Sequence, residues 1–262
     1  VCHYPAGVGT NHALVVTAGG TVSSPVAKDY NPPTVSTVAP ATAVGGEVVT
    51  ISGSDFGGAG AVVTVRGQPC VVDSQTHHTI TCRLPAGAGV GNDLVVSVGG
   101  QSSTPLSFSY GPPRISGLSP ALVGTAGGTI SIAGAGFGAF GATVTVGGAS
   151  CPVTDQSDTT LLCTVEAGVG AGLMVVVSSG GQSSAPASVG YAPPAVDEIA
   201  PQIATADELI VVTGTNFGEA GATVDIGGQP CPVLSQSHGQ LKCVVPAGSG
   251  TQQPLVVTVA GQ

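Results

Sequence analysis

Short runs of aliphatic residues alternate along this chain with clusters of glycine, proline, serine and threonine. Across residues 34–113 the apolar runs fall at 48–52, 62–66, 70–73, 79–84, 94–98 and 106–110. Turn residues separate them at intervals of roughly 8 to 12 positions, which is typical of short antiparallel strands. No stretch keeps an apolar period of about 3.6 residues for long enough to predict a helix. The pattern therefore predicts an all-β fold, with about seven strands packed as an antiparallel sandwich.

The same pattern returns about every 80 residues, which is the signature of an array of like modules. Two sets of aromatic residues keep the period: Phe56, Phe137 and Phe217, and Tyr30, Tyr110 and Tyr191. We expect modules at residues 34–113, 114–194 and 195–262, preceded at 1–33 by the C-terminal part of another. The module at 195–262 would lack its last strand, which we expect to come from continuing polypeptide or from another copy of the chain.

A pair of cysteines, twelve positions apart, marks each complete copy of the repeat. The pairs are Cys70 and Cys82, Cys151 and Cys163, and Cys231 and Cys243. Cys2 aligns with the second member of such a pair, so we expect it to be unpaired in this segment. Zinc is the alternative, but no pair has CxxC spacing and no histidine recurs with the pairs. We therefore predict a disulfide in each copy and an oxidising, extracellular compartment.

Several motifs recur in register through the copies. A strand ends in Gly-x-x-Phe-Gly at 53–57, a hairpin reads Val-x-Val-Gly-Gly-x-x-Cys at 144–151, and the second cysteine precedes Pro-Ala-Gly at 85–87. These motifs resemble the IPT/TIG domain, the immunoglobulin-like fold of plexins, related receptors and some transcription factors. The resemblance implies tandem immunoglobulin-like β-sandwiches that act as interaction or structural modules. It implies no shared active site, so we expect neither an enzyme nor a cofactor or metal.

Paired prolines mark each junction between copies: Pro32 and Pro33, Pro112 and Pro113, and Pro193 and Pro194. Proline fixes φ and favours extended backbone, so the pairs predict stiff joints and an array arranged as a rod. The same six prolines are candidate sites of hydroxylation and of O-linked sugars. No N-x-[ST] sequon occurs in the sequence.

Composition removes several classes of function. Charged residues make up 7% of the chain, and the net charge is −9 with five Lys and Arg residues. Nucleic acids and anionic membrane surfaces require clustered cations, so neither is an expected partner. The longest strictly aliphatic run, at 173–177, is far shorter than the roughly 20 residues of a membrane-spanning helix. We expect no membrane insertion in this segment.

Three motifs have a chemical interpretation that the repeat argues against. Residues 136–141 match GxGxxG, but a dinucleotide site needs a helix after that turn, so we interpret it as a sandwich turn. His77 and His78 have no equivalents as a pair in the other copies and are interpreted as an exposed loop. Asp197 and Glu198 could hold calcium at a junction, but a solvated acidic face explains them better because the other junctions lack acids here.

Two classes of function remain. The first is an extracellular structural protein, secreted or at the cell surface, whose modules form a rod or filament with copies of itself or further modules of the same chain. The alternative is a receptor or adhesion ectodomain that binds a protein or glycan partner. Near-uniform modules favour the first. An extended loop or an exposed aromatic patch would favour the second, and neither is visible in the sequence.

Overall fold

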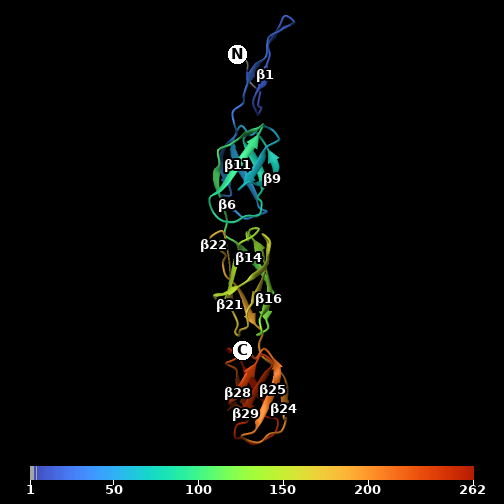
Figure 1. Ribbon diagram of the computed structural model, residues 1–262, viewed down its shortest axis with the longest axis vertical. Coiled ribbons are helices and arrows are strands. Elements are labelled where there is room, and N and C mark those ends of the chain that lie inside the picture. The colour runs from blue at the N-terminus through green and yellow to red at the C-terminus, as the bar shows by residue number, and fades with distance from the viewer. Residues whose placement is uncertain (1–2, 4) are drawn as a thin grey trace. The chain divides into compact units, whose positions relative to one another are not determined.

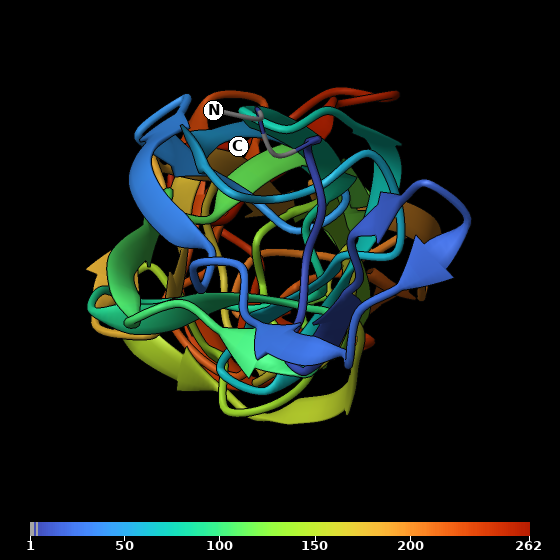
Figure 2. The same ribbon diagram turned by 90° about the horizontal axis from the view of Figure 1, so that it is seen from above.

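The computed structural model describes residue 3 and residues 5–262. The regular secondary structure of these residues consists of β-strands alone, and Figures 1 and 2 show no coiled ribbon. None of the described segments is a helix that could cross a membrane. The all-β prediction is confirmed.

Residue contacts divide the chain into two compact units. The first comprises the residues up to Arg114, together with Ala135–Gly141 and Ser179–Ser183. The second comprises Ile115–Gly134, Ala142–Ser178 and Ser184–Gln262. The division does not follow the sequence repeat, because two turns of the second copy make their contacts with the first unit.

The first unit contains a sandwich built from residues 34–110. Its strands are β5 (Thr34–Ala39), β6 (Thr42–Ala43), β7 (Val48–Ser54), β8 (Val62–Val65), β9 (Gln68–Gln75), β10 (Thr79–Arg83), β11 (Asn92–Val98), β12 (Gln101–Ser102) and β13 (Leu106–Tyr110). They follow the order β5-β7-β10-β9-β8-β11-β13-β6, with β12 beside β11. The long strand β9 pairs with β10 in one layer and β8 in the other.

Period-two alternation explains why these residues form a sandwich. Along β11 every second side chain is buried, and β7 and β8 alternate in the same way. Apart from Asn92, the buried positions carry Val, Ile and Leu, whose branched or compact side chains pack well on a pleated surface. Phe56 fills the end of this core and is fully buried, as are Phe137 and Phe217. The three recurring phenylalanines are therefore core residues.

Upstream of this sandwich, the first unit holds two short antiparallel strand pairs, one nested inside the other. Strand β1 (His12–Leu14) pairs with β4 (Val26–Lys28), and β2 (Thr17–Ala18) pairs with β3 (Thr21–Val22). The β1–β4 register is antiparallel, like that of β11 with β13. That residues 1–33 are the C-terminal part of a further module stays a prediction.

The second unit contains the strands of the second and third copies. The second copy contributes β14 (Arg114–Ser119), β15 (Leu122–Val123), β16 (Gly128–Ala135), β17 (Thr143–Val146), β18 (Ala149–Cys151), β19 (Val153–Gln156), β20 (Thr160–Val165), β21 (Leu173–Ser179), β22 (Gln182–Ser183) and β23 (Ala187–Tyr191). They form two sheets, β14-β16-β20-β19 and β15-β23-β21-β17-β18, with β22 beside β21.

The third copy repeats the two-sheet arrangement. Its strands are β24 (Ala195–Ala200), β25 (Leu209–Thr215), β26 (Thr223–Ile226), β27 (Gln229–Cys231), β28 (Val233–Ser237), β29 (Gln240–Val244) and β30 (Leu255–Thr258). The sheets are β24-β25-β29-β28 and β27-β26-β30. Val169 of the second copy packs against this core, so the second and third copies share apolar contacts within the unit.

Glycine-rich loops recur wherever consecutive copies meet within a unit. A small or branched side chain of one copy lies against a glycine of the next, and at Gly57 and Gly218 it leaves no room for a Cβ. The pairs are Val8 on Gly57, Ala88 on Gly138 and Val169 on Gly218. A glutamine then bonds to the carbonyl of the preceding tyrosine, Gln101 Nε2 to Tyr30 O at 3.1 Å and Gln262 Nε2 to Tyr191 O at 3.3 Å.

Candidate functional site

Each cysteine pair of the repeat is disulfide-bonded in the structure. The bonds join Cys70 to Cys82, Cys151 to Cys163 and Cys231 to Cys243, with Cα–Cα distances of 5.6, 5.5 and 5.5 Å. Cys151 lies on β18 and Cys163 on β20, so the bond ties one sheet to the other. A cross-link closing a loop of this length stabilises by roughly 3 kcal/mol, which matters for a small aliphatic core. Cys2 lies outside the described residues.

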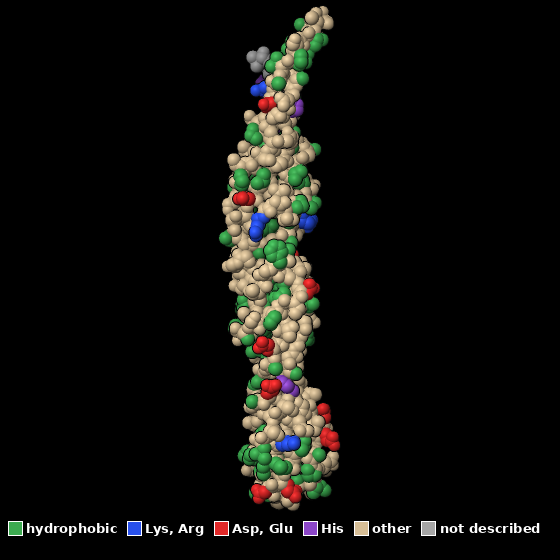
Figure 3. Space-filling model, viewed as in Figure 1, with side chains coloured by type: hydrophobic (Ala, Val, Ile, Leu, Met, Phe, Trp, Pro, Cys, Tyr) green, Lys and Arg blue, Asp and Glu red, His purple; other side chains and the backbone are tan. Residues whose placement is uncertain are grey.

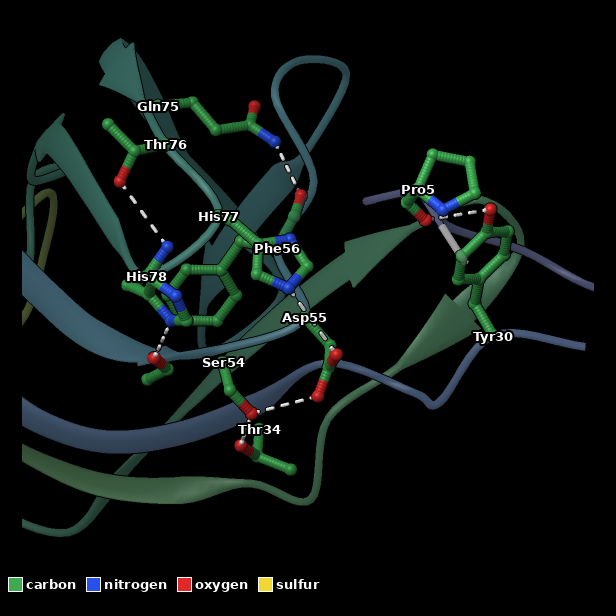
Figure 4. A network of polar contacts seen from close by, with 11 residues as sticks. Pro5, Tyr30, Thr34, Ser54, Asp55, Phe56, Gln75, Thr76, His77 and His78 are labelled. Atoms are coloured by element: carbon green, nitrogen blue, oxygen red, sulfur yellow. Dashed lines mark hydrogen bonds and ion pairs between the residues drawn. The ribbon is translucent and has the colours of Figure 1, made fainter. Parts of the chain in front are cut away.

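The recurring tyrosines close the end of the sandwich at each junction. Tyr110 Oη donates to Pro85 O at 3.2 Å, and Tyr191 Oη donates to Glu166 O at 2.6 Å. Tyr30 repeats the bond with Pro5 O at 3.1 Å, seen at the right of Figure 4. Burial raises the pKa of the Tyr191 phenol, and the nearby Glu166 carboxylate raises it further. These tyrosines are structural, because their hydroxyls are bonded to backbone carbonyls.

His77 and His78 belong to a polar network at the end of the first sandwich (Figure 4). His77 Nε2 lies 3.5 Å from Asp55 Oδ1, and its side chain is only half-buried. His78 is exposed, and its Nδ1 lies 3.4 Å from the carbonyl oxygen of Gly53. The interpretation of both as an exposed loop is therefore wrong for His77. The pair fastens the β9–β10 turn to the turn before Phe56, a structural task.

Other side chains complete this network. Gln75 Nε2 donates to Phe56 O at 2.6 Å, and Gln75 Oε1 accepts from the Ala61 amide at 3.0 Å. The same glutamine contacts recur in the third copy with Gln236, Phe217 and Ala222. The glutamine side chains are thus bonded within their own copies, whereas His77 Nδ1 is buried without a hydrogen-bond partner. Among the described residues no group of three or more His, Cys, Asp or Glu is placed to hold a metal ion.

The third copy uses the equivalent histidine at its junction with the second. His238 Nδ1 lies 2.9 Å from Thr125 Oγ1, and its Nε2 lies 3.6 Å from Glu219 Oε1. Thr125 is 2% exposed, and its Oγ1 also accepts from the Gly218 amide at 3.3 Å. Asn216 Oδ1 accepts from the Thr125 amide at 3.3 Å. This contact could not be predicted from the sequence, because Thr125 and His238 are far apart in the chain.

Only the first proline of each junction pair is exposed. Pro32, Pro112 and Pro193 are exposed, whereas Pro33 and Pro113 are buried and Pro194 is half-buried. An enzyme that hydroxylates the folded chain could reach only the exposed member. Modification of these prolines stays a prediction, and we now expect it at the first position of each pair.

The turn at residues 136–141 presents a large apolar side chain to solvent. Gly136, Gly138 and Gly141 have φ of 75°, 74° and 80°, the left-handed region that favours glycine, and no helix follows them. The turn therefore lacks the strand–turn–helix geometry of a dinucleotide site. At its tip Phe140 is 85% exposed. The equivalent positions in the other copies are Ala59 and Ala220, so the second copy alone carries an aromatic residue here.

A groove of about 550 Å³ lies beside this turn within the first unit. Arg66, Val90 and Asp93 line it, together with the backbone of loop 88–91 and Gly180. Gly138 lies against Ala88 and near Ser179, so the turn that carries Phe140 borders the groove. The wider surface has few charges: Figure 3 shows acidic and basic side chains as isolated spots.

Comparison with known proteins identifies the modules. The fold is a tandem series of immunoglobulin-like sandwiches, each copy with its own disulfide. The sequence model of the IPT/TIG domain matches residues 33–110, 113–191 and 194–262. The chain belongs to the IPT/TIG domain family, and the resemblance seen in the sequence is confirmed.

Relatives extend over most of this chain but only a small part of their own length. Fibrocystin-L of Mus musculus is 29% identical over 257 residues, which cover 91% of this chain and 6% of that protein. Fibrocystin-L of Homo sapiens is 27% identical over 241 residues, covering 88% and 6%.

Solved structures align more loosely. One is a crystal structure with xylogluco-oligosaccharide, 14% identical with a TM-score of 0.46, covering 88% of this chain and 58% of that one. Another is the plexin A4 full extracellular region, 18% identical with a TM-score of 0.34, covering 82% and 21%. At these scores neither superposition supports an inference about function.

Proposed function

We propose that this chain is a binding segment of an extracellular protein, either secreted or at the cell surface, in which IPT/TIG modules present a docking surface to a protein or glycan partner. A disulfide in each copy supports an oxidising compartment. The similarity to Fibrocystin-L across most of the chain supports a place among further modules of a longer protein.

Exposure of Phe140 carries the preference for binding over a filament. The filament hypothesis rested on near-uniform modules and on the absence of an extended loop or an exposed aromatic patch from the sequence. Phe140 is 85% exposed in a chain without tryptophan, where the siblings carry alanine. Large aromatic side chains that stay in water are costly for solubility and are enriched at interaction sites. Self-association in a fibre remains a prediction without a structural observation in its favour.

The test is a binding assay with matched variants. The chain, fused to an antibody Fc to make it bivalent, is applied to intact cells and to extracellular matrix. Phe140→Ala gives the residue of the sibling copies, so we expect an unchanged melting temperature and at least about tenfold weaker binding. Met174→Ala, which removes another exposed apolar side chain of the second copy, is the control and should bind like the natural chain. Equal binding by the Phe140 variant, or none by the natural chain, would contradict the proposal.

A further inference from the structure

Arg66 occupies a backbone position that its siblings give to glycine. Its φ is 51°, in the left-handed region, and the corresponding Gly147 and Gly227 have φ of 58° and 59°. The correspondence is fixed by one recurring backbone hydrogen bond, from Arg66 N to Asp93 O at 2.9 Å, from Gly147 N to Met174 O at 2.8 Å, and from Gly227 N to Pro254 O at 2.9 Å. A side chain with a Cβ costs roughly 1–2 kcal/mol in this conformation. The arginine is therefore retained against a local cost to folding, which points to a task for its side chain.

Asp93 lies beside Arg66 and also lacks a charged counterpart in the other copies, where Met174 and Pro254 stand. Both side chains are exposed. Among the described residues, neither the carboxylate of Asp93 nor the guanidinium of Arg66 forms an ion pair or a side-chain hydrogen bond. One cation and one anion are thus held side by side at the rim of the groove, free to bond to a ligand.

The floor of the groove is rigid. Asn92 is 4% exposed, and its Nδ2 donates to Gly89 O at 2.9 Å and to Phe108 O at 3.3 Å. Gly89 O also accepts from the Tyr110 amide at 2.9 Å, and Gly89 packs directly on Gly180. Because these bonds fix loop 88–92 before any ligand arrives, a ligand would meet a preformed surface and order little of it on binding.

We propose that this groove binds a neutral oligosaccharide, with Arg66 donating to sugar hydroxyl oxygens and Asp93 accepting from sugar hydroxyls. This inference rests on the proposed binding function and names its ligand class. Phosphate or sulfate would be repelled by Asp93, and a basic peptide by Arg66. The lining offers an apolar ligand little beyond Val90, which is 68% exposed. Vicinal hydroxyls, which both donate and accept, match the two charges together, and the volume of about 550 Å³ suits one or two sugar rings.

The test uses the whole chain and a panel of neutral gluco-, galacto-, manno- and N-acetylglucosamine oligosaccharides, with binding followed by backbone amide shifts in NMR. We expect a panel member to shift the amides of Gly89, Val90, Gly91 and Gly180. Arg66→Gly should weaken binding at least about tenfold while leaving the melting temperature unchanged or higher, since it relieves the strained φ. Asp93→Ala should weaken binding to a similar degree. Arg83→Ala removes an exposed cation away from the groove and is the control that should bind normally.

The remaining outcomes overturn the proposal. The proposal is wrong if the amide shifts persist in Arg66→Gly and Asp93→Ala. It is also wrong if the chain binds sulfated but not neutral sugars, or if it binds a zwitterion such as glycine in place of sugars. If no panel member binds while Fc-fused chain still attaches to cells through Phe140, this inference fails and the proposed function stands. If cell binding is also absent, the proposed function fails with it.

Discussion

Tyr191 closes the end of its sandwich with a single side chain. Its hydroxyl donates to Glu166 O at 2.6 Å, and the ring lies over Gly168, leaving no room for a Cβ there. The phenol is 7% exposed. Removing the hydroxyl leaves the carbonyl of Glu166 short of a donor, so the hydrogen bond contributes about 0.5–1.5 kcal/mol to folding.

The raised pKa of Tyr191 makes this contribution depend on pH. As pH rises through about 10, the phenol ionises in the unfolded chain while the folded chain still holds its proton, so the free energy of unfolding falls. We expect Tyr191→Phe to be less stable than the natural chain at neutral pH, and the difference to shrink above pH 10. Denaturant unfolding at a series of pH values measures it.

Glu166→Gln separates the two causes of the shift. It keeps the backbone carbonyl that accepts from Tyr191 and removes the charge that disfavours ionisation. Because burial is the larger cause, the alkaline loss of stability should become smaller in this variant but persist. Complete loss of the pH dependence in Glu166→Gln would mean that charge, rather than burial, raises the pKa.

At the scale of elements, the contact of the second copy with the third depends on a buried threonine. Thr125 Oγ1 accepts from the Gly218 amide and contacts His238 Nδ1. The first copy has a different arrangement, in which Val44 packs on Gly136. The contact between the second and third copies is thus polar, whereas the contact between the first and second copies is apolar, although the sequences around them are similar.

Thr125→Val should loosen the polar contact specifically. The valine has nearly the shape of threonine but leaves the Gly218 N–H and the His238 ring nitrogen without a partner, which costs about 1–3 kcal/mol. We expect faster hydrogen exchange at Gly218, measured by NMR. Thr213→Val, on the exposed face of β25, is the control and should leave exchange at Gly218 unchanged. Unchanged exchange in Thr125→Val would show that another group protects this amide.

At the scale of the whole molecule, each copy depends on its own cross-link because its core is small and aliphatic. Non-reducing peptide mapping should recover Cys70 with Cys82, Cys151 with Cys163 and Cys231 with Cys243. Replacing both Cys231 and Cys243 by alanine should cost about 2–5 kcal/mol in the third copy. Amide exchange should rise there, while the first unit stays protected. Free thiols at these positions, or bridges between copies, would refute the pairing.

The sequence predicted the strands of the core well, because alternation of buried and exposed residues is a local property. The run predicted at 48–52 is β7 (Val48–Ser54), and the run at 106–110 is β13 (Leu106–Tyr110). The first strand of the copy, β5 (Thr34–Ala39), is not among the apolar runs of the sequence. Its side chains are exposed or half-buried and its register shifts between Val35 and Thr37, so its apolar pattern is weak.

The candidate site was less predictable than the fold. The GxGxxG match at 136–141 predicts a turn but not the direction of its side chains, so the exposure of Phe140 could not be predicted from it. Arg66 was counted only as one of five scattered cations. Its left-handed φ and its position next to Asp93 are consequences of the β8–β11 pairing, in which Val65 lies opposite Leu94.

By itself the sequence determined an all-β array of IPT/TIG copies, with recurring phenylalanines in the cores, because period-two burial and an 80-residue repeat are written directly in the order of residues. Only the tertiary structure decided which distant residues meet. Arg66 reaches Asp93, and Thr125 reaches His238, through strand pairing and contacts between copies that involve backbone groups. The tertiary structure also decided that Phe140 is exposed, because a side chain is exposed or buried according to what packs against it.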